Sequence, residues 1–171
     1  MEIFTDGSCS GNPGHGGWGL IVLDGQHWIE RVYKRYDDEL VTNNRMELEA
    51  LLKAIEIAEN QYPEEKIIIY CDSAYCVNIC NNWIFSWAQK GWINSRGVQI
   101  ENYNLVRELW KHIEFPKGKW KIEKIKGHTG IPGNELADAL ARGNAEEFNI
   151  KLEQFDITNP IIDFINRTLE I

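Results

Sequence analysis

Four acidic residues stand beside small or polar neighbours where strands or helices are expected to begin or end. They are Asp6 in Thr-Asp-Gly-Ser, Glu47 in Asn-Asn-Arg-Met-Glu-Leu, Asp72 in Tyr-Cys-Asp-Ser and Asp138 in Gly-Asn-Glu-Leu-Ala-Asp. A single such residue is more often a turn, a cap or a solvated helix position than a ligand. Four that converge would repel one another, and divalent cations would remove that repulsion. Because the set offers only oxygen, it is typical of hard ions such as Mg²⁺, with Mn²⁺ as a substitute.

The first elements of the chain would bring two of these residues together. Strand-like runs cover residues 2–6, 18–23 and 28–36, and Asp24-Gly25 predicts a hairpin turn between the last two. A meander is the simplest arrangement of the three.

A helix is expected over residues 45–61, where leucine, isoleucine and alanine recur at helical spacing. The apolar run 67–71 is typical of a central strand that is covered on both faces. Asp6 and Asp72 both end apolar strands. Their side chains would emerge together if those strands are parallel neighbours, and the other two acidic residues could join them from helices.

Later segments complete one mixed α/β architecture. Helices are expected over residues 73–80, 83–90 and 104–115, a last strand over 120–126, and a final helix from about 134 to 148. This order predicts an α/β fold with a five-stranded mixed sheet flanked by helices, in which a three-strand antiparallel meander is joined by parallel strands.

The chain has 171 residues, of which 43% are hydrophobic, and we expect one domain over residues 1–149 with a C-terminal tail over 150–171. The tail is expected to be partly helical from Pro160 onwards. Its apolar stripe would consist of Ile161, Ile165 and Leu169. Two interpretations remain open, a tail that packs back on the domain, which we favour, and a tail that docks onto a partner protein.

The net charge of −8 argues at first against a nucleic-acid partner. Its distribution matters more than the total, because residues 83–126 contain nine Lys and Arg against four Glu, whereas residues 143–171 contain six acidic residues against two basic ones. The middle of the chain is therefore basic.

We expect a soluble, cytoplasmic protein without a membrane partner, and we expect it to be a monomer. The four cysteines form no CxxC pair or zinc-knuckle pattern, so we expect reduced and largely buried thiols. The chain begins directly with a strand-like segment, and no apolar run is long enough to span a bilayer.

Four blocks of sequence, in this order and spacing, resemble the signature of type 1 ribonucleases H. The blocks are residues 4–8 (Phe-Thr-Asp-Gly-Ser), 42–48 (Thr-Asn-Asn-Arg-Met-Glu-Leu), 72–73 (Asp-Ser), and 127–138 with Gly-His-Thr-Gly followed by Gly-Asn-Glu-Leu-Ala-Asp. The resemblance covers about residues 1–145. It implies a ribonuclease H-like fold and an endoribonuclease that hydrolyses the RNA strand of RNA–DNA hybrids, leaving 5′-phosphate and 3′-hydroxyl ends.

The resemblance also implies a role for each site residue in a mechanism with two metal ions. Asp6 would bridge both ions, and Asp138 would complete the ion that activates water. Glu47 and Asp72 would complete the ion that stabilises the leaving group. His128, in a glycine-rich loop, would transfer a proton or assist product release, although a single loop histidine is usually just a surface residue.

Contacts to the hybrid are implied for a set of polar and aromatic residues. The implied substrate-binding residues are Asn12, Thr42, Asn43, Asn44, Ser73, Trp83 and Asn134. Small polar groups can reach 2′-hydroxyls across the minor groove of an RNA-containing duplex. Trp83 would face a deoxyribose and Thr42 a phosphate of the DNA strand. Without the resemblance, the asparagines would be interpreted as turn and cap residues.

Trp83, Trp87 and Trp92 resemble the helical handle of the family, with core packing favoured for Trp87. The handle has only one cation in Ala88-Gln89-Lys90, so we expect hybrid binding that is easily lost with salt.

Three other functions are compatible with parts of the pattern. A non-catalytic hybrid-binding module would not need four converging carboxylates. A metal-dependent DNA nuclease, resolvase or transposase domain would not explain the asparagine set and the tryptophan handle. A ribonuclease H domain cut from a reverse transcriptase is a further alternative, although the sequence starts with its own Met1 and shows no remnant of a polymerase.

Overall fold

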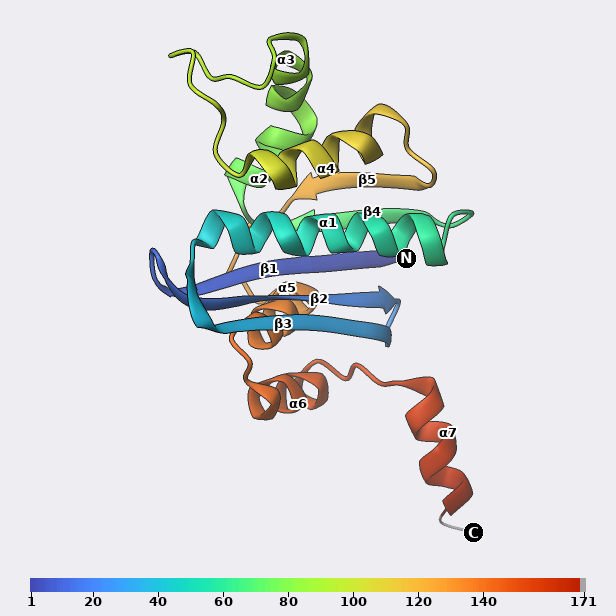
Figure 1. Cartoon of the computed structure of the whole chain (residues 1–171). Helices are drawn as coiled ribbons and strands as arrows, with labels where there is room; N and C mark the ends of the chain where they lie inside the picture. The colour runs from blue at the N-terminus through green and yellow to red at the C-terminus, as the bar shows by residue number, and fades with distance from the viewer. Residues whose placement is uncertain (170–171) are drawn as a thin grey trace.

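The computed structural model describes residues 1–169, and its centre is a five-stranded sheet in the order β3-β2-β1-β4-β5 (Figure 1). The strands are β1 (Glu2–Gly11), β2 (Gly14–Asp24), β3 (His27–Val41), β4 (Lys66–Cys71) and β5 (Lys119–Lys124). The first three pair antiparallel, and β4 pairs parallel with both β1 and β5. The predicted α/β fold with a mixed sheet is confirmed.

The first three strands are longer than the sequence predicts. The extensions of β1 and β2 are rich in glycine, while β3 continues through the acidic residues 37–39, and the register continues through Ser8 opposite Gly17 and Cys9 opposite Gly16. Glycine has a low strand propensity, so these residues carry no strand signal in the sequence. Their backbone groups pair all the same, because the ladder of hydrogen bonds needs no side chain.

The helices α1 and α5 lie on opposite faces of the sheet, and α4 packs beside α1 (Figure 1). The helix α1 (Asn43–Gln61) starts where the Thr42 hydroxyl accepts a hydrogen bond from the Arg45 backbone N–H at 3.2 Å, and its apolar side packs over one core cluster. The helix α5 (Pro132–Ala141) covers the opposite face, where a second cluster contains Phe4, Ile21 and Phe148.

The segment after β4 is a continuous helical run, which corrects the prediction of two separate helices. It consists of α2 (Ala74–Asn78), a π-helical turn η1 (Ile79–Trp83) and α3 (Ile84–Gln89), and is followed by α4 (Tyr103–Glu114). Asn81 and Asn82, which fall between the two expected helices, lie on the exposed side of the π turn. The Asn81 side chain donates to the Ile122 carbonyl at 3.3 Å, which links this turn to β5.

The expected final helix is also two helices, α5 and α6 (Ala145–Gln154). Gly143 has a φ of +69°, a left-handed conformation that suits glycine and ends α5. Asn144 then caps α6 by accepting from the Glu147 backbone N–H at 3.0 Å. The expected domain boundary after Asn149 lies inside α6, and Ile157 beyond it is still buried.

The predicted C-terminal helix is present as α7 (Pro160–Leu169), but it does not pack on the domain as we expected. None of its residues is buried, and Figure 1 shows it extending away from the sheet. The Thr158 backbone bonds to Gln26 and to Trp28, which fixes the start of α7 beside the β2–β3 turn and directs it off the body. The last two residues of the expected tail lie outside the described part.

The state of the cysteines and the presence of membrane-spanning helices can both be checked on residues 1–169. All four cysteines are free thiols and three of them are buried, as predicted. Within that range, no helix combines the length and the apolar character needed to cross a membrane.

Candidate active site

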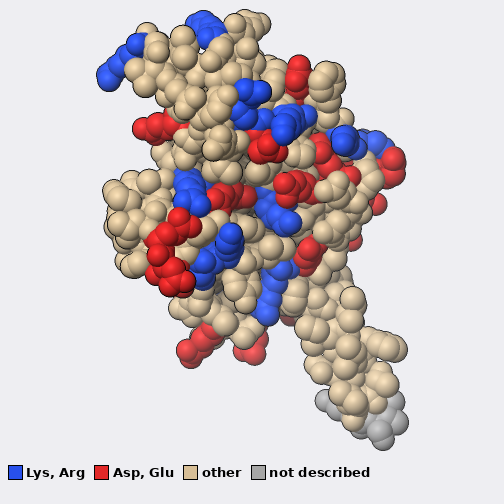
Figure 2. Space-filling model, viewed as in Figure 1, with Lys and Arg blue, Asp and Glu red and all other residues tan. Residues whose placement is uncertain are grey.

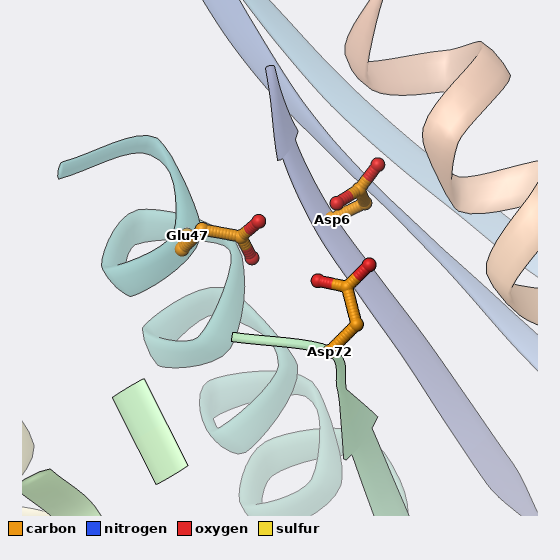
Figure 3. A group of neighbouring side chains, drawn as sticks. All are labelled: Asp6, Glu47 and Asp72. Atoms are coloured by element: carbon orange, nitrogen blue, oxygen red, sulfur yellow. The ribbon is translucent and has the colours of Figure 1, made fainter. Parts of the chain in front are cut away.

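Three of the four predicted carboxylates meet beside the end of β4 and the middle of β1. Asp6 does not end its strand as expected, because β1 continues through the paired residues Gly7 to Gly11. Asp6 lies on β1, Glu47 on α1 and Asp72 directly after β4, and each offers an oxygen within 4.8 Å of the others. Figure 3 shows the three carboxylates turned toward one another. The structure confirms that β1 and β4 are parallel neighbours, with Thr5 opposite Cys71, so the residue after each emerges at the same edge.

Two glycines allow the elements to approach closely enough for this cluster. A Cβ atom on Gly7 would lie 2.5 Å from the backbone nitrogen of Glu47, so only glycine lets β1 touch α1 here. A Cβ atom on Gly127 would collide with the carboxyl group of Asp72. Gly7 and Gly127 are thus required for the close packing beside Glu47 and Asp72.

Two of the clustered carboxyl groups are buried, and Asp72 beside them is partly exposed. Asp6 is 5% exposed and Glu47 is 7% exposed. Burial, the charge of Asp72 and contact with Asp138 raise the pKa of Asp6 to about 8. Burial, with smaller effects of the charges of Asp6 and Asp72, raises the pKa of Glu47 well above its ordinary value. A divalent cation would relieve this repulsion, and an all-oxygen donor set suits Mg²⁺, so the residues present fit the metal that the family pattern implies.

Asp138 lies on the other side of Asp6 and is paired with a cation. Burial raises its pKa, but the hydrogen bonds and charge of Arg142 outweigh that effect, so the net pKa is lowered. Nε and Nη2 of Arg142 donate to one Asp138 oxygen at 3.0 and 2.8 Å. We did not predict a role for Arg142, although the spacing of four residues on a helix is the signal that could have revealed the pair.

An open pocket of about 400 Å³ joins most of the predicted residues. Its lining includes Asp6, Glu47, Asp72, Asp138, His128, Asn43, Asn44 and Ser73, together with Gly7, Ser8 and Cys9. His128 is exposed in the loop between β5 and α5, with a φ of +55°. The pocket is polar and open to solvent on one side, as a site for a nucleic-acid backbone would need to be.

Asn134 is placed behind the carboxylates instead of at the surface. It is 2% exposed, and its amide donates to an Asp72 oxygen at 3.5 Å while its carbonyl oxygen accepts from the His128 backbone N–H at 3.4 Å. In this position it orients Asp72 and the His128 loop, and it is not exposed to a substrate.

The remaining predicted contact residues lie outside the pocket lining. Asn12 and Thr42 are exposed beside the start of α1, where Asn12 accepts from the Asn43 backbone N–H at 3.2 Å and Thr42 forms the cap. Trp83 is 42% exposed, and its ring centre lies 6.0 Å from that of Trp87. Trp87 itself packs against the core, as favoured from the sequence.

Clustered carboxylates beside an open polar pocket are the arrangement that metal-dependent phosphodiester hydrolases use. The chain belongs to the RNase H family, whose model matches residues 1–146. It is 39% identical over 150 residues to the ribonuclease H of Rhizobium etli, covering 86% of this chain and 93% of that relative.

Solved structures agree with this assignment. LC9-RNase H1, described as a type 1 RNase H with the type 2 active-site motif, is 27% identical with a TM-score of 0.67, over 82% of this chain and 69% of that one. LC11-RNase H1, solved in complex with an RNA/DNA hybrid, is 22% identical with a TM-score of 0.56, over 82% of this chain and 92% of that one. This second likeness bears on the fold alone.

Proposed function

We propose that the protein hydrolyses the RNA strand of RNA–DNA hybrids at the pocket around Asp6, leaving 5′-phosphate and 3′-hydroxyl ends. As a member of the RNase H family it is an endoribonuclease. The observation that carries the proposal is the placement of Asp6, Glu47 and Asp72 with oxygens within 4.8 Å of one another in a pocket that is open to solvent.

The four carboxylates would hold two Mg²⁺ ions, with Mn²⁺ as a substitute. Asp6 contacts both Glu47 and Asp138, which supports a bridging position between the two ions. Glu47 and Asp72 would complete one ion and Asp138 the other. When bound, the ions would activate a water molecule and offset the charge on the leaving 3′ oxygen.

His128 and the rim of the pocket would handle protons and the substrate. The His128 ring is exposed at the rim of the pocket, where it would transfer a proton or assist the departure of the product. Asn43, Asn44 and Ser73 line the pocket and would reach ribose hydroxyls, which DNA lacks. Trp83 presents an exposed ring that would contact the DNA strand.

Charge distribution supports a nucleic-acid partner in spite of the net charge of −8. In Figure 2, Lys and Arg side chains stand at the top of this face, over α3 and the loop that follows it. This is the handle region that would hold the DNA strand, and LC11-RNase H1 is a relative by fold that was solved with a hybrid.

End-labelled RNA–DNA hybrid, duplex RNA and duplex DNA, each with Mg²⁺ or EDTA, test the proposal. We expect cleavage of RNA in the hybrid only, and none with EDTA. Cleavage of duplex DNA would indicate the related DNA nucleases, and metal-dependent binding without cleavage would indicate a non-catalytic hybrid-binding module.

We further propose that the catalytic body is monomeric and that α7 docks onto a partner protein. Ile161 and Phe164 are each 70% exposed and Leu169 is 79% exposed. An isolated helix of ten residues is marginal in water, so α7 would gain stability from a surface that covers this face. Sedimentation of the purified protein tests the oligomeric state, and we expect a monomer. A dimer that is lost in Phe164→Asp would instead identify a second copy of this chain as the partner of α7.

A further inference from the structure

Polar groups behind the pocket hold three of the four carboxylates. Asp72 accepts from the Asn134 amide, and Asp138 accepts from the Arg142 guanidinium. Glu47 accepts from a thiol, with the Cys71 Sγ atom 3.8 Å from its Oε2 atom. Groups in such a second layer orient metal-binding side chains and contribute to the affinity for the ion.

The position of Cys71 follows from the strand that carries it. It is the last residue of β4, and the alternation of that strand turns Ile67, Ile69 and Cys71 toward α1, the helix that carries Glu47. Cys71 is 0% exposed. The thiol therefore reaches Glu47 from inside the core, on the side away from the pocket.

A buried carboxylate is costly unless a donor satisfies it. A thiol is a weak donor, but it is neutral and small, so it can satisfy a Glu47 oxygen without adding a positive charge that would compete with a metal ion. Arg142 beside Asp138 shows the contrasting solution, in which a charged donor is half-exposed at the edge of the site.

We propose that Cys71 is a positioning residue, whose thiol holds the Glu47 carboxylate toward Asp6 and Asp72 and thereby raises the affinity of the site for a divalent cation. The inference depends on one part of the proposed function, namely that Asp6, Glu47 and Asp72 form the metal site. A simpler role, in which Cys71 only fills space in the core, predicts a loss of stability without a change in metal affinity.

Two variants at this position and one elsewhere separate these roles. Cys71→Ala removes the donor, while Cys71→Ser replaces it with a hydroxyl in nearly the same space. Cys80→Ala removes a thiol of the same core cluster that makes no hydrogen bond to Glu47 and is 3% exposed. It is the matched control for lost volume.

The measurement is Mg²⁺ titration of the substrate-free full chain by calorimetry, with circular dichroism to confirm folding and the Mg²⁺ dependence of hybrid cleavage as a second readout. We expect Cys71→Ala to weaken Mg²⁺ binding by about 10-fold, the lower end of the range for such residues because a thiol is a weak donor, with Cys71→Ser close to the natural protein and Cys80→Ala unchanged.

Three results would overturn the inference. They are unchanged Mg²⁺ affinity in folded Cys71→Ala, an equal loss in Cys80→Ala, and a loss in Cys71→Ser as large as in Cys71→Ala. Failure of the proposed function would give a different result from failure of this inference. In that case the natural protein itself would neither bind Mg²⁺ at Asp6 nor cleave the hybrid.

Discussion

Replacing Asp6 with asparagine should stabilise the metal-free protein and abolish its activity. Asp6 is 5% exposed and lies against Asp72 and Asp138, so its charge is unfavourable when no cation is bound. Asparagine has nearly the same shape and no charge. The substitution therefore removes the repulsion without leaving a cavity. It also removes the carboxylate that contacts both Glu47 and Asp138, which is the expected bridging ligand of the two metal ions.

The magnitude follows from the pKa of Asp6. Its folded-state pKa is about 8, against an ordinary value of 3.8. One pKa unit corresponds to about 1.4 kcal/mol, so a shift of about 4 units sets an upper limit near 6 kcal/mol at pH 8. Water penetration and relaxation of the open pocket reduce this, and we expect about 1–3 kcal/mol in the free energy of unfolding.

The pH dependence has a definite sign. Because the folded-state pKa is raised, the protonated form contributes stability that is complete below about pH 4 and is lost as the pH rises through about 8. The metal-free natural protein should lose stability between pH 5 and pH 8, on the order of the same few kcal/mol, whereas Asp6→Asn should lose less.

Urea unfolding in EDTA at both pH values, followed by circular dichroism, measures these differences. Asp38→Asn, a change of the same kind at an exposed position on β3, is the control and should leave the free energy of unfolding unchanged. An Asp6→Asn protein that is no more stable than the natural one at pH 8 would refute the idea that the carboxylates repel one another in the absence of metal.

Four other changes test separate parts of the structure. His128→Ala should slow turnover about 100-fold while Mg²⁺ and hybrid binding persist, and unchanged single-turnover and steady-state rates would remove it from the mechanism. Gly7→Ala should lower the free energy of unfolding by about 2 kcal/mol or more, because its Cβ would lie 2.5 Å from the Glu47 backbone, and thermal unfolding checks this. Burial raises the pKa of Glu59, but hydrogen bonds from His112, Lys117 and Trp120 outweigh it, so the net pKa is lowered. Glu59→Gln should therefore lower the free energy of unfolding at pH 7. Urea titrations should show that this difference from the natural protein shrinks below pH 4.5. Hybrid binding measured by fluorescence anisotropy should weaken steeply as salt is raised, and a flat response would contradict the handle as a phosphate-binding surface.

The carboxylate cluster could be predicted because its parts have strong local signals. Asp6 follows the apolar part of β1 and Asp72 follows β4, and parallel pairing of those strands places the two residues side by side. Glu47 follows a clear helix start, where Thr42 is the cap. The spacing of the four blocks therefore indicated the fold and the site together.

Features that depend on packing could not be predicted. The burial of Asn134 follows from its place at the start of α5 against the sheet, and nothing in its local sequence distinguishes a buried amide from an exposed one. The π turn through Asn81 is stabilised by its bond to Ile122, which is distant in the chain. The exposure of α7 depends on the anchoring of Thr158 beside the β2–β3 turn.

Anomalous diffraction from crystals soaked in Mn²⁺ tests the central claim most directly. We predict one Mn²⁺ peak in contact with Asp6, Glu47 and Asp72, a second between Asp6 and Asp138 when a non-cleavable hybrid is bound, and neither peak in Asp6→Asn. Manganese bound elsewhere, or an empty carboxylate cluster in a hybrid complex, would contradict the account.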